Sequence, residues 1–192
     1  MAAPADAFRN SAEVEAAFRN APPEVIAEIM DGELHLQPRP GTPHGLATSA
    51  LGEELGPPFK RGRGGPGGWV ILDEPELHLG PGPDKLVPDL AGWRRERMPE
   101  VPDAPAILLA PDWICEVLSP STIGIDRGRK RRIYAREGVA FLWLVDPAAQ
   151  TLEAYRLVDG RWTEVATFEG NARVWAEPFD AIELDLETLW AR

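Results

Sequence analysis

Residues 113–146, WICEVLSPSTIGIDRGRKRRIYAREGVAFLWLVD, decide the fold of this chain. The apolar run that begins this stretch predicts a strand ended by Ser-Pro, and the run 141–146 predicts a strand buried on both faces. Between them, residues 125–137 have the spacing of a helix, which Gly138 ends. A strand, a helix and a strand in this order predict a crossover connection with two parallel strands.

Further elements extend this unit toward the N-terminus. Residues 43–55 predict a helix with Thr42 as its N-cap, stopped by the Gly-Pro-Pro at 56–58. Strands are predicted at 69–73 and 85–93, and 76–80 is a continuation or partner of the first of them. The order of helix, three strands, helix and strand predicts an α/β fold with an αβββαβ core and a central mixed sheet.

Two Asp-Gly pairs, at 31–32 and 159–160, each separate two strand-like runs and so predict hairpins. The register of the first hairpin places Glu28 opposite His35. We expect these N- and C-terminal hairpins to add to the central sheet at either end. Residues 1–21 predict a helical extension, because Pro22-Pro23 ends an amphipathic pattern.

Length and composition bound the class of protein. A chain of 192 residues suits a single domain, 1–192, with a full hydrophobic core. The one cysteine, Cys115, excludes an internal disulfide and is expected to be a buried apolar residue. No secretory signal or apolar run of membrane-spanning length is present, so we expect a cytoplasmic protein without a membrane partner.

Acidic residues outnumber basic ones, and the basic residues are unevenly distributed along the chain. The formal net charge is −11, which argues against a nonspecific nucleic-acid coat protein. The basic residues nevertheless cluster at 60–63, 94–97 and 127–136, where they are either solvated surface charge or a local patch for phosphates. The Gly-rich stretch 61–68 is predicted to be a loop, since it lacks the Gly-Lys-Ser/Thr of a phosphate-binding P-loop.

Two carboxylates lie inside apolar strands. Glu116 is surrounded in sequence by apolar residues, and Asp89 lies similarly within 85–93. A charged group in such a strand is costly unless another group pairs with it or a metal binds it. If the strands are adjacent, the two carboxylates converge, and their oxygens suit Mg²⁺ or Mn²⁺. The alternative is a buried ion pair or a pair of solvated strand ends.

The helix at 125–137 brings a cation toward these acids. At about 100° per residue, Lys130 shares a face with Ile133 and Tyr134, and this apolar face should turn toward the sheet. Lys130 is then directed inward, either to act in a site or to form a salt bridge with Glu116 or Asp126. Other basic residues of the helix point outward and are candidates for contacts with nucleic-acid phosphates, namely Arg127, Arg131 and Arg132.

Three stretches together resemble a known family. PDLAGW at 88–93, PDWICEVLSPST at 111–122 and DRGRKRRIYAREGVAFLWLVDP at 126–147 are similar to the bacterial family described as "putative restriction endonuclease", also called Uma-two. This family belongs to the PD-(D/E)XK nuclease superfamily, and the resemblance covers roughly 22–157. It implies a restriction-endonuclease-like fold with the αβββαβ core expected above.

The resemblance also implies roles for individual residues. Asp89 matches the aspartate of the superfamily motif, and Glu116 matches its second acidic metal ligand. The superfamily lysine stands two residues after that acid, where this chain has Leu118, and Lys130 resembles the displaced lysine of this family. Glu28, His44 and Tyr134 are further candidates that could support the catalytic residues. Glu28 and His44 are at least as readily explained as surface or helix-end residues.

The leading functional hypothesis is a Mg²⁺-dependent or Mn²⁺-dependent endodeoxyribonuclease. In this hypothesis Asp89 and Glu116 hold the metal, Lys130 completes the catalytic set, and DNA is the substrate. One alternative is a catalytically inactive nuclease-fold protein that binds or regulates, which the acidic net charge and the missing in-place lysine favour. Another is a phosphoesterase acting on small phosphate esters. A homodimer is left open.

Overall fold

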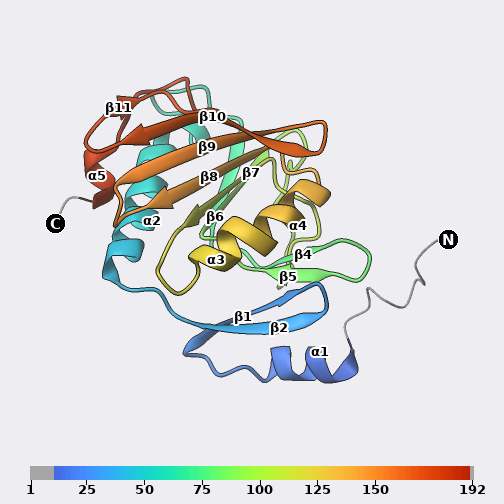
Figure 1. The fold of residues 1–192 in the computed structure, drawn as a ribbon. Coiled ribbons are helices and arrows are strands. Elements are labelled where there is room, and N and C mark those ends of the chain that lie inside the picture. The colour runs from blue at the N-terminus through green and yellow to red at the C-terminus, as the bar shows by residue number, and fades with distance from the viewer. Residues whose placement is uncertain (1–10, 191–192) are drawn as a thin grey trace.

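The computed structural model describes residues 11–190 as two main sheets with helices packed around them (Figure 1). A six-stranded mixed sheet has the order β10-β9-β8-β7-β6-β3, and a four-stranded sheet has the order β2-β1-β5-β4. The strands are β1 Val25–Met30, β2 Glu33–Pro38, β3 Trp69–Asp73, β4 Leu77–Leu79, β5 Asp84–Leu86, β6 Leu90–Arg94, β7 Trp113–Val117, β8 Phe141–Asp146, β9 Thr151–Val158, β10 Arg161–Glu169, β11 Arg173–Val174 and β12 Leu184–Asp185. The helical segments are α1 Ala12–Arg19, α2 Thr42–Leu55, η2 Gly56–Lys60, α3 Ile123–Ile125, η3 Asp126–Lys130, α4 Arg131–Arg136 and α5 Glu187–Trp190.

The strand–helix–strand unit has the predicted form. Strand β7 runs parallel to β8, with Glu116 paired to Leu144, while β6 is antiparallel to β7. The predicted helix begins slightly early, at Ile123, and ends before Gly138, whose φ of 76° suits only glycine well. Its middle turn, η3, is π-helical, a local widening that is frequent at functional sites. The central mixed sheet predicted from the sequence is therefore confirmed.

The predicted strand 85–93 is wrong as a single element. It divides into β5 and β6, which lie in different sheets. The break falls at residues 87–89, where Pro88 has no N–H to continue a ladder. The preceding strand β4 pairs with β5 and is neither a continuation nor a partner of β3. The chain thus changes sheets at the point that carries Asp89.

The N-terminal hairpin has the predicted register, with Glu28 opposite His35, and turns through positive φ angles at Asp31 and Gly32. Its placement in the central sheet is wrong, because β1 pairs with β5 in the smaller sheet. The C-terminal hairpin β9–β10 does extend the central sheet beside β8. Figure 1 shows the N-terminal hairpin below the central sheet, with α1 packed against it.

Helix α2 differs from the prediction at both ends. Gly41 rather than Thr42 is its N-cap, and Pro43 lies in the first turn, where its missing N–H costs nothing. The Gly-Pro-Pro sequence does not stop the helix, which continues as η2 to Lys60. The helical extension predicted within 1–21 is found as α1 at Ala12–Arg19, and residues 1–10 lie outside the described part of the chain.

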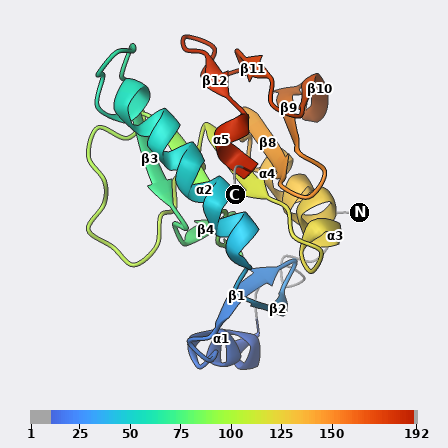
Figure 2. The ribbon, with the colours of Figure 1, turned by 90° about the vertical axis from the view of Figure 1, so that its left-hand side faces the viewer.

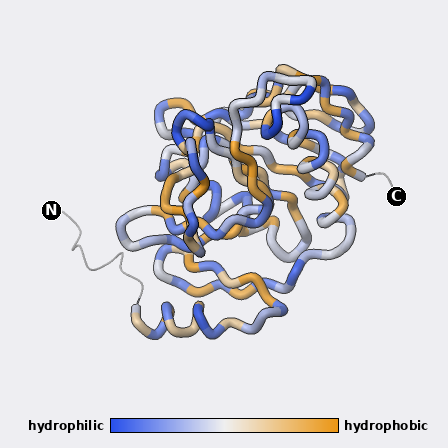
Figure 3. The backbone as a smooth tube through the Cα atoms, turned by 180° about the vertical axis from the view of Figure 1, so that it is seen from behind, coloured by the Kyte–Doolittle hydropathy of each residue, from blue (hydrophilic) through white to orange (hydrophobic). Residues whose placement is uncertain are grey.

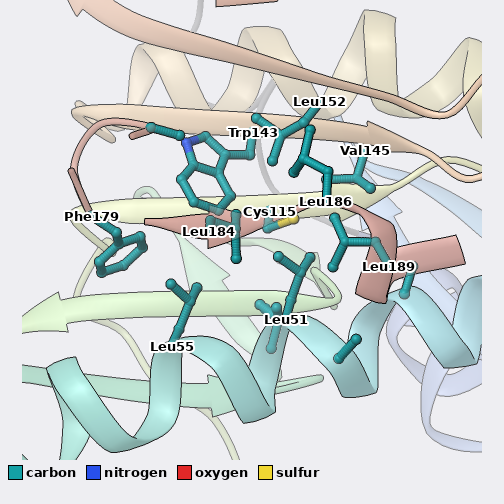
Figure 4. Packing of buried hydrophobic residues seen from close by; sticks show 14 of the residues in the cluster. Leu51, Leu55, Cys115, Trp143, Val145, Leu152, Phe179, Leu184, Leu186 and Leu189 are labelled. Carbon is teal, nitrogen blue, oxygen red and sulfur yellow. The ribbon is translucent and has the colours of Figure 1, made fainter. Parts of the chain in front are cut away.

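The central sheet separates two hydrophobic cores. On one face α2 and the C-terminal segments cover Cys115 and Trp143, with Phe179 nearby (Figure 4). Trp113 belongs to the same core, and Phe179 makes edge contacts with both tryptophans. On the other face α4 covers Ile114 and its neighbours. The backbone coloured by hydropathy shows these apolar strands inside a hydrophilic periphery (Figure 3). Because side chains alternate along β7, Glu116 points to the same face as Ile114, toward η3 and α4.

Within residues 11–190, none of the helices combines the length and the apolar character that crossing a membrane requires.

Candidate active site

Two carboxylates meet where β6 begins and β7 ends. The antiparallel register pairs Leu90 with Cys115, so Asp89 lies one residue beyond this pair, opposite Glu116. Asp89 Oδ2 accepts a hydrogen bond of 2.7 Å from the backbone N–H of Val117. Both carboxylates line one cavity of about 30 Å³. The structure therefore brings together the two acids that the sequence analysis singled out.

Lys130 reaches these acids from the following helix. Its Nζ lies 3.2 Å from Glu116 Oε2, although the two residues are 14 positions apart in the chain. The π-helical turn η3 carries Lys130, and the side chain is only 5% exposed. A helix-borne lysine thus occupies the neighbourhood of the acidic pair, as the inward-facing helical stripe predicted.

Two more carboxylates surround the same ammonium. Glu28 Oε1 lies 3.0 Å and Asp126 Oδ1 lies 3.5 Å from Lys130 Nζ. Glu28 comes from the smaller sheet, where it also accepts hydrogen bonds from Gln37 Nε2 and from the backbone N–H of Val87. The sequence analysis named Asp126 as a salt-bridge partner of Lys130, four residues later on the same helical face, but not as a site residue; the ion pair is present and Asp126 also lines the cavity.

His44 and Tyr134 hold the two principal acids. His44 Nε2 lies 2.9 Å from Asp89 Oδ1, because α2 begins beside the turn that carries Asp89. The Tyr134 hydroxyl donates to Glu116 Oε1 at 2.5 Å. Glu28, His44 and Tyr134, which the sequence placed in supporting positions, are all buried in or beside this cluster. Their contribution to any reaction stays a prediction.

Burial and crowding of like charges set the protonation of the cluster. Burial raises the pKa of Glu116 well above its ordinary value; Lys130 opposes the shift, while Asp126 and Asp89 add to it. Burial likewise raises the pKa of Asp126, against the effect of Lys130. Burial alone would lower the pKa of Lys130, but Glu116 and Glu28 outweigh it, and the net pKa lies well above the usual lysine value. Burial thus favours the neutral form of Glu116, and the surrounding carboxylates favour the charged form of Lys130.

The residues present fit a small divalent cation only as a minimal site. In the described chain, no group of three or more His, Cys, Asp or Glu side chains is arranged to hold a metal ion. Mg²⁺, however, usually keeps several waters and takes one or two protein carboxylates, which Asp89 and Glu116 provide. The cavity has about the volume of one water molecule, and the buried Asp126 Oδ1 accepts no hydrogen bond. Excess carboxylate charge in a space of this size favours a cation.

The helix arginines predicted to contact phosphates are placed differently from one another. Arg127 donates to both carboxylate oxygens of Glu153. The guanidinium of Arg131 stacks 4.0 Å from the centroid of the Tyr155 ring. Arg132 is exposed. Two of the three are thus engaged within the protein.

The mixed sheet and its buried acidic pair, joined by a lysine from the crossover helix, define a restriction-endonuclease-like α/β class of protein. The family model described as "Putative restriction endonuclease" matches residues 13–187. The chain therefore belongs to this family, Uma2.

Comparison with solved structures supports the same fold. A putative nuclease of the DUF820 family from Anabaena variabilis ATCC 29413 has a similar crystal structure, with a TM-score of 0.72 and 23% sequence identity. The match covers 93% of this chain and 97% of the other. None of the curated proteins compared with this chain matches it.

Proposed function

We propose that this chain is a metal-dependent nuclease that hydrolyses phosphodiester bonds of DNA, with Asp89, Glu116 and Lys130 as its catalytic set and Mg²⁺ or Mn²⁺ as its cofactor. Membership of a family described by nuclease activity supports the general class. The DNA substrate, the metal and the individual residue roles are the finer parts of the proposal.

One observation carries the proposal more than any other. The superfamily motif places its lysine two residues after the second acid, but this chain has Leu118 there and the lysine lies in the next helix. In the folded chain, Lys130 Nζ nevertheless lies 3.2 Å from Glu116, in the cavity that Asp89 also lines. The displacement in sequence is compensated in space, and this supports Lys130 as the third member of the proposed catalytic set.

The protein side of the mechanism follows from these contacts. A bound divalent cation supplies Lewis acidity and neutralises negative charge that develops on the phosphate. Asp89 and Glu116 would hold it, with His44 and the Val117 N–H orienting the first carboxylate and Tyr134 the second. Lys130 adds a preorganised positive charge in a site shielded from water, where it is worth more than in bulk solvent.

A specific observation also favours the alternative of an inactive binding protein. Each carboxylate oxygen of Asp89 and Glu116 already has a partner within the chain, and Lys130 lies among three carboxylates. Such a cluster is internally compensated in part and can persist as a structural ion network. A metal titration and a cleavage assay therefore separate the two functions.

The experiment compares wild-type protein with Asp89→Asn on plasmid DNA, single-stranded and duplex oligonucleotides and p-nitrophenyl phosphate, each with Mg²⁺, Mn²⁺ or EDTA. We expect metal-dependent cleavage of DNA by the wild type and none by Asp89→Asn. The matched control is Asp103→Asn, which changes an exposed aspartate outside the cavity and should cleave normally. Hydrolysis of p-nitrophenyl phosphate alone would instead favour a small-ester phosphoesterase. Calorimetry that detects no metal binding, with no cleavage of any substrate, would favour the inactive protein.

A further inference from the structure

The cationic side chains that are available to bind a nucleic acid lie away from Arg127 and Arg131. Lys60, Arg61 and Arg63 are exposed, and in the described chain none of them forms an ion pair. By contrast, Arg127 is paired with Glu153, and Arg131 is stacked on Tyr155. In a protein of net charge −11, an unpaired group of three cations is a marked local exception.

Tertiary structure brings a second basic segment to the same place. Strands β3 and β6 pair with Trp69 opposite Arg94, and the N–H of Arg95 donates to Gly68 O at 2.9 Å. The guanidinium of Arg94 lies 4.1 Å from the centroid of the Trp69 ring, and Arg95 Nη2 donates to Trp69 O at 3.3 Å, so both side chains are engaged within the protein, as Arg131 is. The segment 94–95 thus lies beside the loop that follows Lys60. The three cations without an ion pair in the described chain, Lys60, Arg61 and Arg63, are here called the basic edge.

The loop that carries part of the basic edge is held in a defined shape. The backbone N–H of Arg63 donates to Pro57 O, and that of Gly67 donates to Pro58 O, both at 2.8 Å. The positive φ angles of Gly62 and Gly67 allow the loop to fold back on η2. Because the chain is already ordered by these bonds, a ligand that binds Arg63 need not order the loop first.

A groove of about 740 Å³ connects the basic edge with the candidate active site. Its walls are α2 and the edge strand β3, and Figure 2 shows α2 running from the N-terminal hairpin toward the far end of the sheet. Lys60 and Arg61 line one end of the groove. Pro40 and His44 line the other end and also line the small cavity that contains Asp89 and Glu116. The two spaces therefore adjoin.

The charges along this groove restrict where phosphates can lie. Glu53, Asp73 and Glu74 also line it and disfavour phosphates beside them, and Glu74 is next to Asp89, to whose carbonyl its N–H donates at 3.0 Å. Phosphate anchoring is thus concentrated at the basic edge, and a phosphate at the other end depends on the metal of the proposed function. From His44 to Lys60 the helical chain advances 16 residues, or roughly 24 Å at 1.5 Å per residue. At about 3.4 Å per stacked nucleotide, a strand needs about seven nucleotides to reach both ends.

We propose that the basic edge is the phosphate-anchoring surface for a single strand of nucleic acid, at least about seven nucleotides long, that enters the active site along the groove beside α2. A single strand is favoured because a groove of this volume suits a small flexible ligand, not a rigid duplex. The acids at the other end are also nearly buried, with the side chain of Asp89 only 13% exposed. This inference rests on the proposed function for its substrate class, but it concerns binding rather than cleavage.

The test is fluorescence anisotropy with labelled dT3, dT16 and a 16-base-pair duplex, measured in EDTA so that no cleavage occurs. The test variant changes Lys60, Arg61 and Arg63 together to Glu. The control variant changes Arg19, Arg132 and Arg161 together to Glu, which are also exposed. Both variants change the net charge equally, and the control includes the helix arginine that remains free.

We expect wild-type protein to bind dT16 more tightly than either dT3 or the duplex. The test variant should lose on the order of tenfold or more in affinity for dT16, and its salt slope should fall by about 2, at roughly 0.7 per phosphate contact on a single strand. The control should lose much less. Equal losses in the two variants, a larger loss in the control, or preferred binding of the duplex would overturn the inference. Binding of dT16 that is lost in the test variant, in a protein that cleaves no substrate with any metal, would contradict only the proposed function.

Discussion

Lys130 and Glu116 form an ion pair of 3.2 Å that joins strand β7 to the helical crossover that follows it. The side chains are 5% and 3% exposed, so both charges depend on protein partners rather than on water. Two further carboxylates, Glu28 and Asp126, share the same ammonium. The catalytic role proposed for this residue pair would therefore be coupled to the stability of the fold.

Replacement of Lys130 by Ala should lower stability and abolish most cleavage. Without the ammonium, three buried carboxylates face one another, and losing one partner of a buried pair costs roughly 3–5 kcal/mol. Removal of one preorganised charge-stabilising group commonly reduces the rate on the order of 10²–10³-fold. Melting curves with and without Mg²⁺, beside a cleavage assay, measure both effects. If Mg²⁺ restores the melting temperature of the variant but not its cleavage, Lys130 has a catalytic role; an unchanged rate would remove it from the catalytic set.

Replacement of His44 by Ala should weaken metal binding without removing a ligand. His44 Nε2 orients the Asp89 carboxylate at 2.9 Å, and loss of such an outer partner commonly costs about 10–100-fold in metal affinity. Titration calorimetry with Mn²⁺ measures the change, and His44→Gln should recover part of the affinity, since its amide can donate to the same oxygen. An affinity equal to that of the wild type would show that Asp89 is positioned by the Val117 N–H alone.

The stability of the metal-free protein should fall as the pH rises above the ordinary carboxyl range. Burial raises the pKa of Glu116 in the folded state, against the effect of Lys130, so between the unfolded pKa of about 4.3 and the folded value the folded protein binds more protons. The contribution of Glu116 to the free energy of unfolding therefore decreases with pH across this window. Urea unfolding in EDTA at several pH values measures the slope. Glu116→Gln should make the slope less negative than that of the wild type, whereas Asp103→Asn should leave it unchanged; equal slopes in Glu116→Gln and wild type would contradict the raised pKa.

Replacement of Gly92 by Ala should destabilise the fold without changing the site. A Cβ atom at this position would lie 3.1 Å from the Trp113 ring and 3.2 Å from the Trp69 ring. Overpacking of this kind typically costs about 1–3 kcal/mol. The control is Gly52→Ala in helix α2, where the nearest atom is 3.7 Å away and the change should stabilise by about 0.5–1 kcal/mol. Thermal denaturation compares the two, and a neutral Gly92→Ala would mean that the tryptophans can move apart.

Much of the core was predictable from local pattern. The apolar runs of β7 and β8, the helical spacing between them and the Asp-Gly turns are signals that few tertiary contacts override. The same helical spacing correctly placed Lys130 on a buried face with Ile133 and Tyr134. These features depend on residues that are near one another in the chain, so their physical cause is contained in a short segment.

The second sheet was not predictable in the same way. Residues 85–93 have a continuous strand pattern, yet the chain changes sheets at 87–89 because β5 pairs with β1 and β4, while β6 pairs with β3 and β7. Which distant strands pair with one another leaves no periodic pattern in the sequence, so these partners could not be predicted. The contact of Glu28 with Lys130 therefore could not be predicted from local pattern. It joins strand β1 of the smaller sheet to η3, which packs on the central sheet.

The sequence by itself determined the identity of the acidic residues, the parallel strand pair and the inward face of the helix, because periodic burial of apolar side chains specifies which way each residue points. Tertiary structure alone decided which cations are free. Arg127 and Arg131 are engaged because β9 lies beside their helix, and Arg94 is engaged because the pairing of β3 with β6 places Trp69 opposite it. In the described chain the basic edge has no ion-pair partner. Charge pairing acts over a few ångströms in space regardless of separation along the chain, so a count of basic residues cannot show which remain available to a ligand.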